Sequence, residues 1–313
     1  MPKPAPKPSF LARFWTYLAE RFPLQMNGVV IAVFTFSAIS YSRICRGEEG
    51  FVAWDDYLLG FFVTLTIFFM VRIFDEFKDQ KEDALYRQYL PVPRGLISLK
   101  ELFWVGVVTV IAQFAVILLF HPTLLWLYLL AMGYLLLMRV EFFVPDWLKQ
   151  RQILYIASHM VIIPLVDVYA TGVDWKLEAA LPSTGLFFFF AVSYLNGVVL
   201  EFGRKMRAPE QEEEGVVSYT GLYGAKGGVI IWLILLWLTL GCSLFAAAYA
   251  GYGWWGYSCL ISFCLFATLP GVRFWQHATP ARAKYVEYAA GAWTVAMYLT
   301  LGGVPMLRAL LLS

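Results

Sequence analysis

Two stretches rich in carboxylates directly follow long apolar runs, and their side chains could bind a cation. In the first stretch, Asp75, Asp79 and Asp83 recur at every fourth residue. The second stretch runs from Glu201 to Glu214. A charged side chain costs roughly 2.5 to 3.5 kcal/mol at the centre of a membrane helix, so acidic groups beside such helices suggest a function. Two such stretches at helix ends predict a hard-cation site at a membrane surface, a pattern typical of an enzyme that handles a diphosphate.

The spacing of the first stretch places its carboxylates on one face if the helix continues past the apolar run. Residues four apart drift by only about 40° around a helix, so the three aspartates would stack. Like charges at this spacing repel unless a cation offsets them. Mg²⁺ fits, because it takes one or two carboxylates, keeps several waters and completes its shell with substrate phosphate. We therefore predict Mg²⁺ as the cofactor, with ligands drawn from Asp75, Asp79, Asp83, Glu201 and Glu210.

The second stretch mixes acidic and basic side chains. Glu201 ends the apolar run, Glu210 follows in a loop, and Arg204 and Lys205 lie between them. Carboxylates can hold a metal while guanidinium and ammonium groups hold phosphate oxygens. The alternative interpretation is that these are solvated loop charges, and it applies most directly to the run of glutamates at 212–214.

The elements that must position these residues are membrane helices. Hydrophobic residues make up 60% of the 313-residue chain and charged residues only 15%, which excludes an ordinary soluble domain. A helix needs about 20 apolar residues to cross the hydrocarbon core. We therefore predict an all-α membrane protein, a nine-helix bundle with cytoplasmic loops capping a central cavity. The predicted spans are 24–42, 55–74, 99–120, 122–140, 151–171, 183–201, 227–249, 253–270 and 284–303.

The distribution of Lys and Arg predicts the orientation, because cytoplasmic loops carry an excess of these residues. We place the N-terminus in the cytoplasm. Only Arg43, Arg46, Lys176 and Arg308 of the 24 Lys and Arg residues then lie on the other side, which leaves 20 on the cytoplasmic side. Both acidic stretches consequently share the cytoplasmic face, and the C-terminus lies on the opposite side of the bilayer.

Composition also describes the chain ends and excludes some partners. Residues 1–22 are basic and rich in Pro, which predicts a flexible cytoplasmic tail before one membrane domain over 23–313. A net charge of +2 is too small to imply a nucleic-acid partner. The four cysteines match no zinc motif, and we interpret them as packing residues. The oligomeric state stays open.

The order of these features resembles the UbiA superfamily of intramembrane prenyltransferases, in which acidic motifs follow the second and sixth of nine helices. Asp75 and Asp79 resemble the DxxxD pair of the first motif, and GVVSYT from Gly215 resembles the sequence after the second. Tyr134 and Arg139 are similar to a Tyr and a basic residue at the end of the fourth helix. A stretch after the first motif has Pro91, Pro93, Gly95 and Ser98 in register with the family, and Gly224 and Lys226 follow the second motif at a distance that fits it.

The resemblance implies Mg²⁺-dependent transfer of a prenyl group from an isoprenyl diphosphate to a hydrophobic acceptor, aromatic or lipid-like, with loss of diphosphate. The lipid bilayer is then a second partner. We expect the catalytic residues to be Asp75, Asp79, Glu201, Arg139 and Asn196. We expect the diphosphate to contact Arg72, Arg204, Lys205, Lys226 and Arg139.

The chain departs from the family pattern in both motifs. Val71 and Arg72 stand where an Asn-Asp pair opens the first motif, and the second motif uses Glu in place of Asp. These departures bear on the substrates more than on the reaction class. Within the spans, Asn196 either faces the cavity or bonds a neighbouring helix. His159 is either an acceptor base or a packing donor, and Asp167 is expected at the outer interface.

Two other functions stay open at the level of sequence. A terpene cyclase of the same superfamily would act on an isoprenyl diphosphate without an acceptor. A transporter of cations or lipid diphosphates would place its charges near the bilayer midplane on broken helices. The second and sixth spans have no Gly or Pro break at their centres, and this favours the enzyme.

Overall fold

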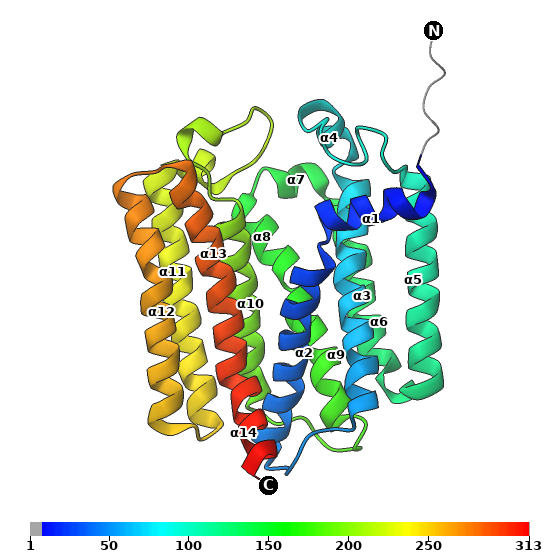
Figure 1. Ribbon diagram of the computed structural model, residues 1–313, viewed down its shortest axis with the longest axis vertical. Helices are drawn as coiled ribbons and strands as arrows, with labels where there is room; N and C mark the ends of the chain where they lie inside the picture. The colour runs from blue at the N-terminus through cyan, green and yellow to red at the C-terminus, as the bar shows by residue number, and fades with distance from the viewer. Residues whose placement is uncertain (1–7, 313) are drawn as a thin grey trace.

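The computed structural model describes residues 8–312, whose regular structure is entirely helical (Figure 1). Nine spans in this part of the chain are long and apolar enough to cross a membrane, which confirms the predicted number. They are Leu24–Arg46 (α2), Trp54–Lys78 (α3), Leu99–Phe120 (α5), Pro122–Arg139 (ending in α6), Gln152–Trp175 (α8 and α9), Leu186–Arg204 (α10), Tyr219–Tyr249 (α11), Gly253–Gln276 (α12) and Pro280–Leu311 (beginning with α13).

Shorter helices divide or connect these spans. Within the composite spans the elements are η1 (Pro122–Leu124), α6 (Leu125–Arg139), α8 (Gln152–Met160), α9 (Ile162–Trp175), α13 (Pro280–Tyr298), η4 (Leu299–Gly303) and α14 (Val304–Leu312). Outside the spans they are α1 (Phe10–Arg21), α4 (Gln80–Tyr86), η2 (Glu141–Phe143), α7 (Pro145–Lys149) and η3 (Pro209–Gln211).

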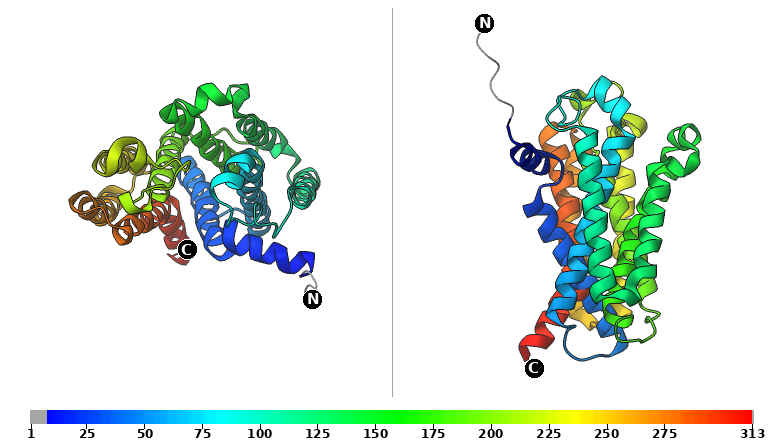
Figure 2. Two further views of the ribbon diagram at one scale, coloured as in Figure 1. Left: turned by 90° about the horizontal axis from the view of Figure 1, so that it is seen from above. Right: turned by 90° about the vertical axis from the view of Figure 1, so that its right-hand side faces the viewer.

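The spans stand side by side (Figure 1). We use the term motif end for the end of the bundle at which α3 and α10 terminate, and the term distal end for the opposite one. Helices α10, α11, α12 and α13 pack on one another in chain order. On the other side, α3 packs on α5, α6 and α9. Helix α2 contacts α3, α9, α13 and η4, so it joins the two groups, as the view from above also shows (Figure 2).

The prediction of a flexible tail is wrong for Phe10–Arg21. These residues form helix α1, which lies across the motif end (Figure 1). The Ser9 hydroxyl caps this helix by accepting a hydrogen bond from the amide of Ala12 at 3.3 Å. Tyr17 and Leu18 are buried in a small apolar cluster with residues of α2 and α5. An amphipathic helix lies along a membrane surface because only one of its faces is apolar. Residues 1–7 lie outside the described part.

The spans bend or break where the sequence disfavours a regular helix. Helices α8 and α9 are separated at Val161, shortly before Pro164, whose missing amide and ring disturb helical hydrogen bonding. Gly224 has a φ of 73° inside α11, a conformation that glycine adopts without a steric cost. In η4, Gly302 packs so closely on α2 that a Cβ there would collide with the carbonyl oxygen of Ser37.

A buried ion cluster joins α2 to α9 at the distal end. Asp174 of α9 is fully buried and accepts hydrogen bonds from Ser42 at 2.7 Å, Arg43 at 3.1 Å and Arg46 at 2.8 Å. Glu178, which follows α9, pairs with both arginines. The charges of Arg43 and Arg46 are therefore neutralised inside the protein.

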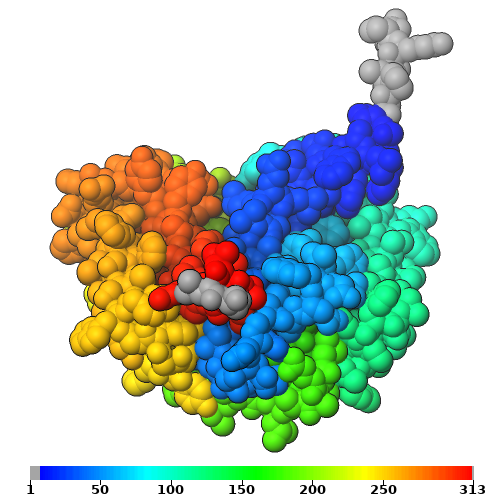
Figure 3. Space-filling model, turned by 60° about the horizontal axis from the view of Figure 1, so that its bottom comes forward, coloured from blue at the N-terminus to red at the C-terminus, as the bar shows by residue number. Residues whose placement is uncertain are grey.

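On the distal face, α14 lies between the ends of α11 and α12 and the ends of α2 and α3 (Figure 3).

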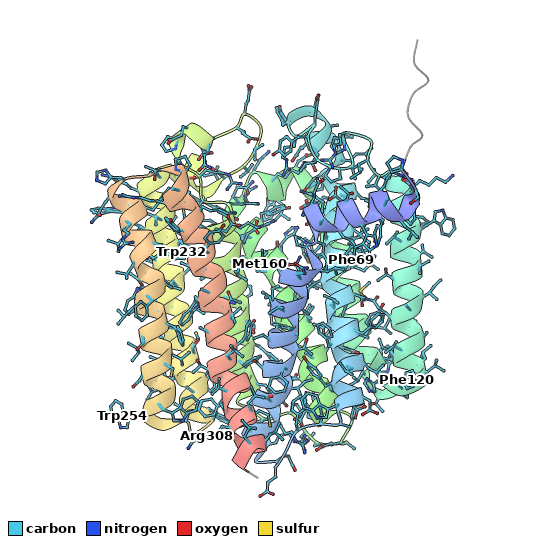
Figure 4. All side chains as sticks on the ribbon, viewed as in Figure 1. Phe69, Phe120, Met160, Trp232, Trp254 and Arg308 are labelled. Carbon is cyan, nitrogen blue, oxygen red and sulfur yellow. The ribbon has the colours of Figure 1, made fainter. Side chains whose placement is uncertain are left out.

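Large side chains mark both ends of the spans. Trp254, Phe120 and Arg308 lie at the distal end, and Phe69 and Trp232 lie nearer the motif end (Figure 4). Trp254 is 86% exposed, as expected of an aromatic side chain at a bilayer interface. The expectation that Asp167 lies at the outer interface is wrong, because its side chain is fully buried within α9.

Candidate active site

The two acidic stretches lie at the same end of the bundle, because α3 and α10 both finish at the motif end (Figure 1). The charges of Asp75 near the end of α3 and Arg204 at the end of α10 interact. The charges of Asp75 and Lys205 also act on the imidazole of His159 in α8, which lies 3.6 Å from the carboxylate of Glu141. These interactions join three helix ends in what we call the central polar cluster. It consists of Asp75, Lys78, Glu141, Tyr155, His159, Glu201, Arg204 and Lys205.

The predicted face of three stacked aspartates is wrong, because the helix does not continue. Helix α3 ends at Lys78, and Asp79 joins it to the separate helix α4. Asp83 is buried and pairs with Arg87 at 2.6 Å, and its charge also interacts with Arg21 of α1. Burial raises the pKa of Asp83, although the positive charge of Arg87 opposes this. The structure therefore keeps Asp83 outside the central polar cluster.

Helix α1 supports the first motif from the other side of α3. Glu76 is 1% exposed and accepts a hydrogen bond from the guanidinium of Arg21 at 2.7 Å. The guanidinium of Arg72 lies 3.5 Å from Glu76 and 3.7 Å from Asp75, so two carboxylates share it. A buried charge without such partners would be strongly destabilising. Arg72, a predicted diphosphate ligand, thus lies beside the cluster but already has acidic partners.

The end of α10 concentrates charge of both signs. Glu201 pairs with Arg204 at 2.6 Å and with Lys205 at 2.8 Å. The ammonium of Lys205 also lies 5.8 Å from the centre of the Tyr219 ring. That ring stacks on Phe202 with their centroids 3.7 Å apart. Acidic, basic and aromatic groups therefore meet at the start of the second motif, where the sequence places Glu201, Arg204 and Lys205.

The remainder of the second motif does not join this group. Glu210 is exposed, and its carboxylate makes no hydrogen bond or ion pair within residues 8–312, so the structure does not support its predicted grouping with the other metal ligands. Glu212 accepts hydrogen bonds from Ser218 at 2.6 Å and Thr220 at 2.8 Å, which fixes the start of α11. Lys226 is exposed, and its ammonium lies 5.5 Å from the ring centre of Trp275 on α12.

Two other predicted residues have partners on neighbouring helices. The guanidinium of Arg139 at the end of α6 lies 5.5 Å from the ring centroids of both Phe74 and Phe77. Asn196 is buried in α10 and accepts a hydrogen bond from Thr294 of α13 at 3.2 Å. Of the two alternatives for Asn196, the structure therefore contains the bond to a neighbouring helix. The catalytic roles of both residues stay predictions.

Lys78, Tyr155 and Glu141 belong to the cluster, but the sequence pattern does not single them out. The ammonium of Lys78 donates to the Tyr155 hydroxyl at 2.6 Å. It also lies 3.6 Å from the carboxylate of Asp75 and 3.7 Å from that of Glu141. The Nε2 atom of His159 lies 3.6 Å from the other carboxylate oxygen of Glu141. Five ionisable side chains from three segments therefore share one small volume.

Glu141 reaches this position through a strained turn. Glu141, Phe142 and Phe143 have φ angles of 49°, 52° and 63°, a left-handed conformation that is unusual for residues other than glycine. Each such residue costs on the order of 1–3 kcal/mol, and strain of this kind gathers at functional sites. Burial raises the pKa of the Glu141 carboxyl. The only sequence signal for Glu141 is its place directly after the basic end of the fourth span.

The residues are better suited to bind a divalent ion that arrives with a substrate phosphate group than to form a metal site of their own. Within residues 8–312, no three His, Cys, Asp or Glu side chains lie close enough together to hold a metal. The carboxylate of Asp79 makes no hydrogen bond or ion pair in this part of the chain. Mg²⁺ needs only one or two carboxylates when substrate phosphate completes its shell. Asp79 and its neighbour Asp75 could therefore supply the protein ligands.

The electrostatics of Asp79 differ from those of an exposed carboxylate. Burial raises its pKa to about 6. The positive charge of Lys78 opposes this change, whereas the negative charge of Asp75 adds to it. A bound cation would stabilise the charged form of Asp79 more than that of its neighbours, because Asp79 is costly to ionise and makes no ion pair within residues 8–312.

Comparisons with known proteins bear on the fold and the family of this chain. No curated protein matches the sequence. A solved structure described as digeranylgeranylglyceryl phosphate synthase superposes with a TM-score of 0.60 at 17% identity, over 94% of this chain and 99% of that one. At this identity the likeness shows the fold alone. The sequence profile of the UbiA prenyltransferase family matches residues 31–295. This chain therefore belongs to the UbiA prenyltransferase family and is an integral membrane prenyltransferase.

Proposed function

We propose that this prenyltransferase binds the diphosphate of its isoprenyl donor at the central polar cluster and transfers the prenyl group to an aromatic or lipid-like acceptor. The observation that carries the proposal is the contact of α8 with both motif helices: its Tyr155 accepts from Lys78 of α3 at 2.6 Å, and α8 also packs on α10. It brings carboxylates and basic groups from the two motifs to one place. Family membership supports the isoprenyl diphosphate and the membrane setting.

The charges of the cluster suit departure of a diphosphate. Cleavage of the allylic C–O bond leaves the bonding electrons on the diphosphate and a positive charge on the prenyl carbon. Arg204, Lys205 and Lys78 offer cationic groups at which the new negative charge is stabilised. A Mg²⁺ ion bound with the substrate at Asp75 and Asp79 would supply further charge neutralisation there.

The aromatic side chains suit the other half of the reaction. An allylic cation must be kept from water, and aromatic ring faces stabilise positive charge. Tyr155 and the stacked pair of Phe202 and Tyr219 lie beside the basic groups of the cluster. The apolar prenyl chain would extend from there among the spanning helices, where the acceptor also dissolves. We expect the motif end to face the cytoplasm, because the excess of Lys and Arg lies there.

Release of pyrophosphate tests this proposal most directly. Purified protein in lipid nanodiscs is expected to release pyrophosphate from geranyl, farnesyl or geranylgeranyl diphosphate in the presence of Mg²⁺, and faster with a suitable acceptor. Release without an acceptor, together with a hydrocarbon product, would instead identify a cyclase. The proposal fails if none of the donors is turned over while the protein takes up diphosphates into vesicles.

The raised pKa of Asp79 predicts the acidic limb of the pH profile. Since burial raises this pKa to about 6, the carboxyl is protonated below that pH and loses the charge needed to hold a cation. We expect kcat/KM to rise with pH through about 6, because this ratio reports ionisations of the free enzyme. The measurement uses donor concentrations well below KM. A profile that stays flat from about pH 5 to about pH 7 would contradict the assignment.

A further inference from the structure

Lys78 occupies the position of a cation within the first acidic motif. Its ammonium lies 3.6 Å from the carboxylate of Asp75, 3.7 Å from that of Glu141 and 2.6 Å from the Tyr155 hydroxyl. Its charge also interacts with that of Asp79. The side chain is 12% exposed, so solvent screens these interactions only weakly. Oxygen atoms from three separate segments thus surround one positive charge.

The surroundings of Lys78 hold its ammonium in place. The Tyr155 hydroxyl that accepts from Lys78 lies 3.4 Å from the carboxylate of Glu141, to which it donates. Glu141 is itself placed by a turn of left-handed residues, a strained conformation that the surrounding contacts must stabilise. Of the three hydrogens on the Lys78 ammonium, Tyr155 takes one at short range. The remaining hydrogens can point to an acceptor on the substrate.

While Lys78 is in place, Asp75 and Glu141 cannot bind one divalent ion together. Mg²⁺ requires its oxygens at about 2.0–2.1 Å, whereas these carboxylates flank the ammonium at 3.6 Å and 3.7 Å. Arg72 adds a second positive charge beside Asp75. It stands where the family pattern has an acidic residue, and its guanidinium lies 3.7 Å from the Asp75 carboxylate. Two basic side chains therefore partly offset the charge of the Asp75 carboxylate from within the chain.

We infer that Lys78 is a built-in cation of this site, which takes one cation position between Asp75 and Glu141 and presents its charge to the donor diphosphate. A divalent ion is then needed only between Asp79 and Asp75, and none is needed between Asp75 and Glu141. The inference rests on the proposed function, since it names the diphosphate as the group that Lys78 contacts. Lys78 binds and positions the leaving group and takes no part in proton transfer.

Metal binding by a charge-removing variant tests the inference. In Lys78→Met, the carboxylates of Asp75 and Glu141 lose their shared cation, so we expect the affinity for Mn²⁺ alone to increase at least tenfold, as measured by electron paramagnetic resonance. Pyrophosphate release is expected to fall and to recover partly as Mg²⁺ is raised. Lys78→Arg keeps the charge and should bind Mn²⁺ as the unmodified protein does. Lys284→Met, which removes an exposed lysine that pairs with Glu287 on α13, should change neither quantity.

A second variant is expected to change the Mn²⁺ affinity in the opposite direction, and it tests the inference even if Lys78→Met does not fold. Glu141→Gln leaves Lys78 with an excess of positive charge, so the affinity for Mn²⁺ is expected to fall. Unchanged Mn²⁺ affinity in both variants, or a loss of activity in Lys78→Met that Mg²⁺ does not relieve, would overturn the inference. The Mn²⁺ titration needs no prenyl donor. A protein that shows these shifts but releases no pyrophosphate would contradict the proposed function and leave the built-in cation standing.

Discussion

Asp79→Asn is expected to lower kcat for prenyl transfer by about 10²- to 10³-fold, the scale for loss of one group that stabilises developing charge. The substitution keeps the size of the side chain and removes its charge. Asp79 is the carboxylate of the first motif that makes no ion pair within residues 8–312, so a bound cation is its natural partner. Pyrophosphate release at saturating donor and Mg²⁺, measured on protein with an unchanged circular dichroism spectrum, checks the result.

Glu82→Gln provides a matched control in the helix that directly follows Asp79. Glu82 lies in α4, its side chain is 47% exposed, and it pairs with Lys149 at 2.6 Å. An exposed ion pair of this kind contributes little, so kcat is expected to stay within about twofold of the unmodified protein. If both variants lose activity equally, the effect belongs to the loop as a whole and the assignment of Asp79 is wrong.

Asp174→Ala is expected to destabilise the fold by about 3–5 kcal/mol, the usual cost of breaking a buried charge pair by removing one partner. Asp174 is fully buried and accepts hydrogen bonds from Arg43, Arg46 and Ser42. Its removal leaves two poorly exposed guanidinium groups with only Glu178, which is 38% exposed, as a shared carboxylate. Reversible unfolding of the detergent-solubilised protein with sodium dodecyl sulfate measures the free-energy change.

Glu48→Gln is the control for this experiment. Glu48 pairs with Arg46 at 3.2 Å in the same cluster, but its side chain is 45% exposed. The expected loss is below about 1 kcal/mol, because solvent screens the pair. A comparable loss in both variants would show that the number of charges, and not their burial, stabilises the junction of α2 and α9.

The outcome at the first motif illustrates where pattern-based prediction stops. A period of four residues correctly identifies Asp75 and Asp79 as neighbours at a helix end. It is wrong for Asp83, since α3 ends at Lys78 and Asp83 instead pairs with Arg87 in a buried position. Helical spacing predicts a shared face only while one helix continues, and the point at which α3 gives way to α4 is not visible in the spacing itself.

The sequence by itself determined the nine spans and the carboxylates and basic residues at their motif ends. Hydrocarbon thickness sets the length of an apolar run, and charged groups are excluded from its middle, so both features can be counted along the chain. Only the tertiary structure decided which charges meet. Arg21 reaches Glu76 across 55 residues, and Lys78 reaches Tyr155 across 77. Such pairs depend on how helices pack and where they end, because the cost of burying a charge is offset only by a partner that the fold brings near.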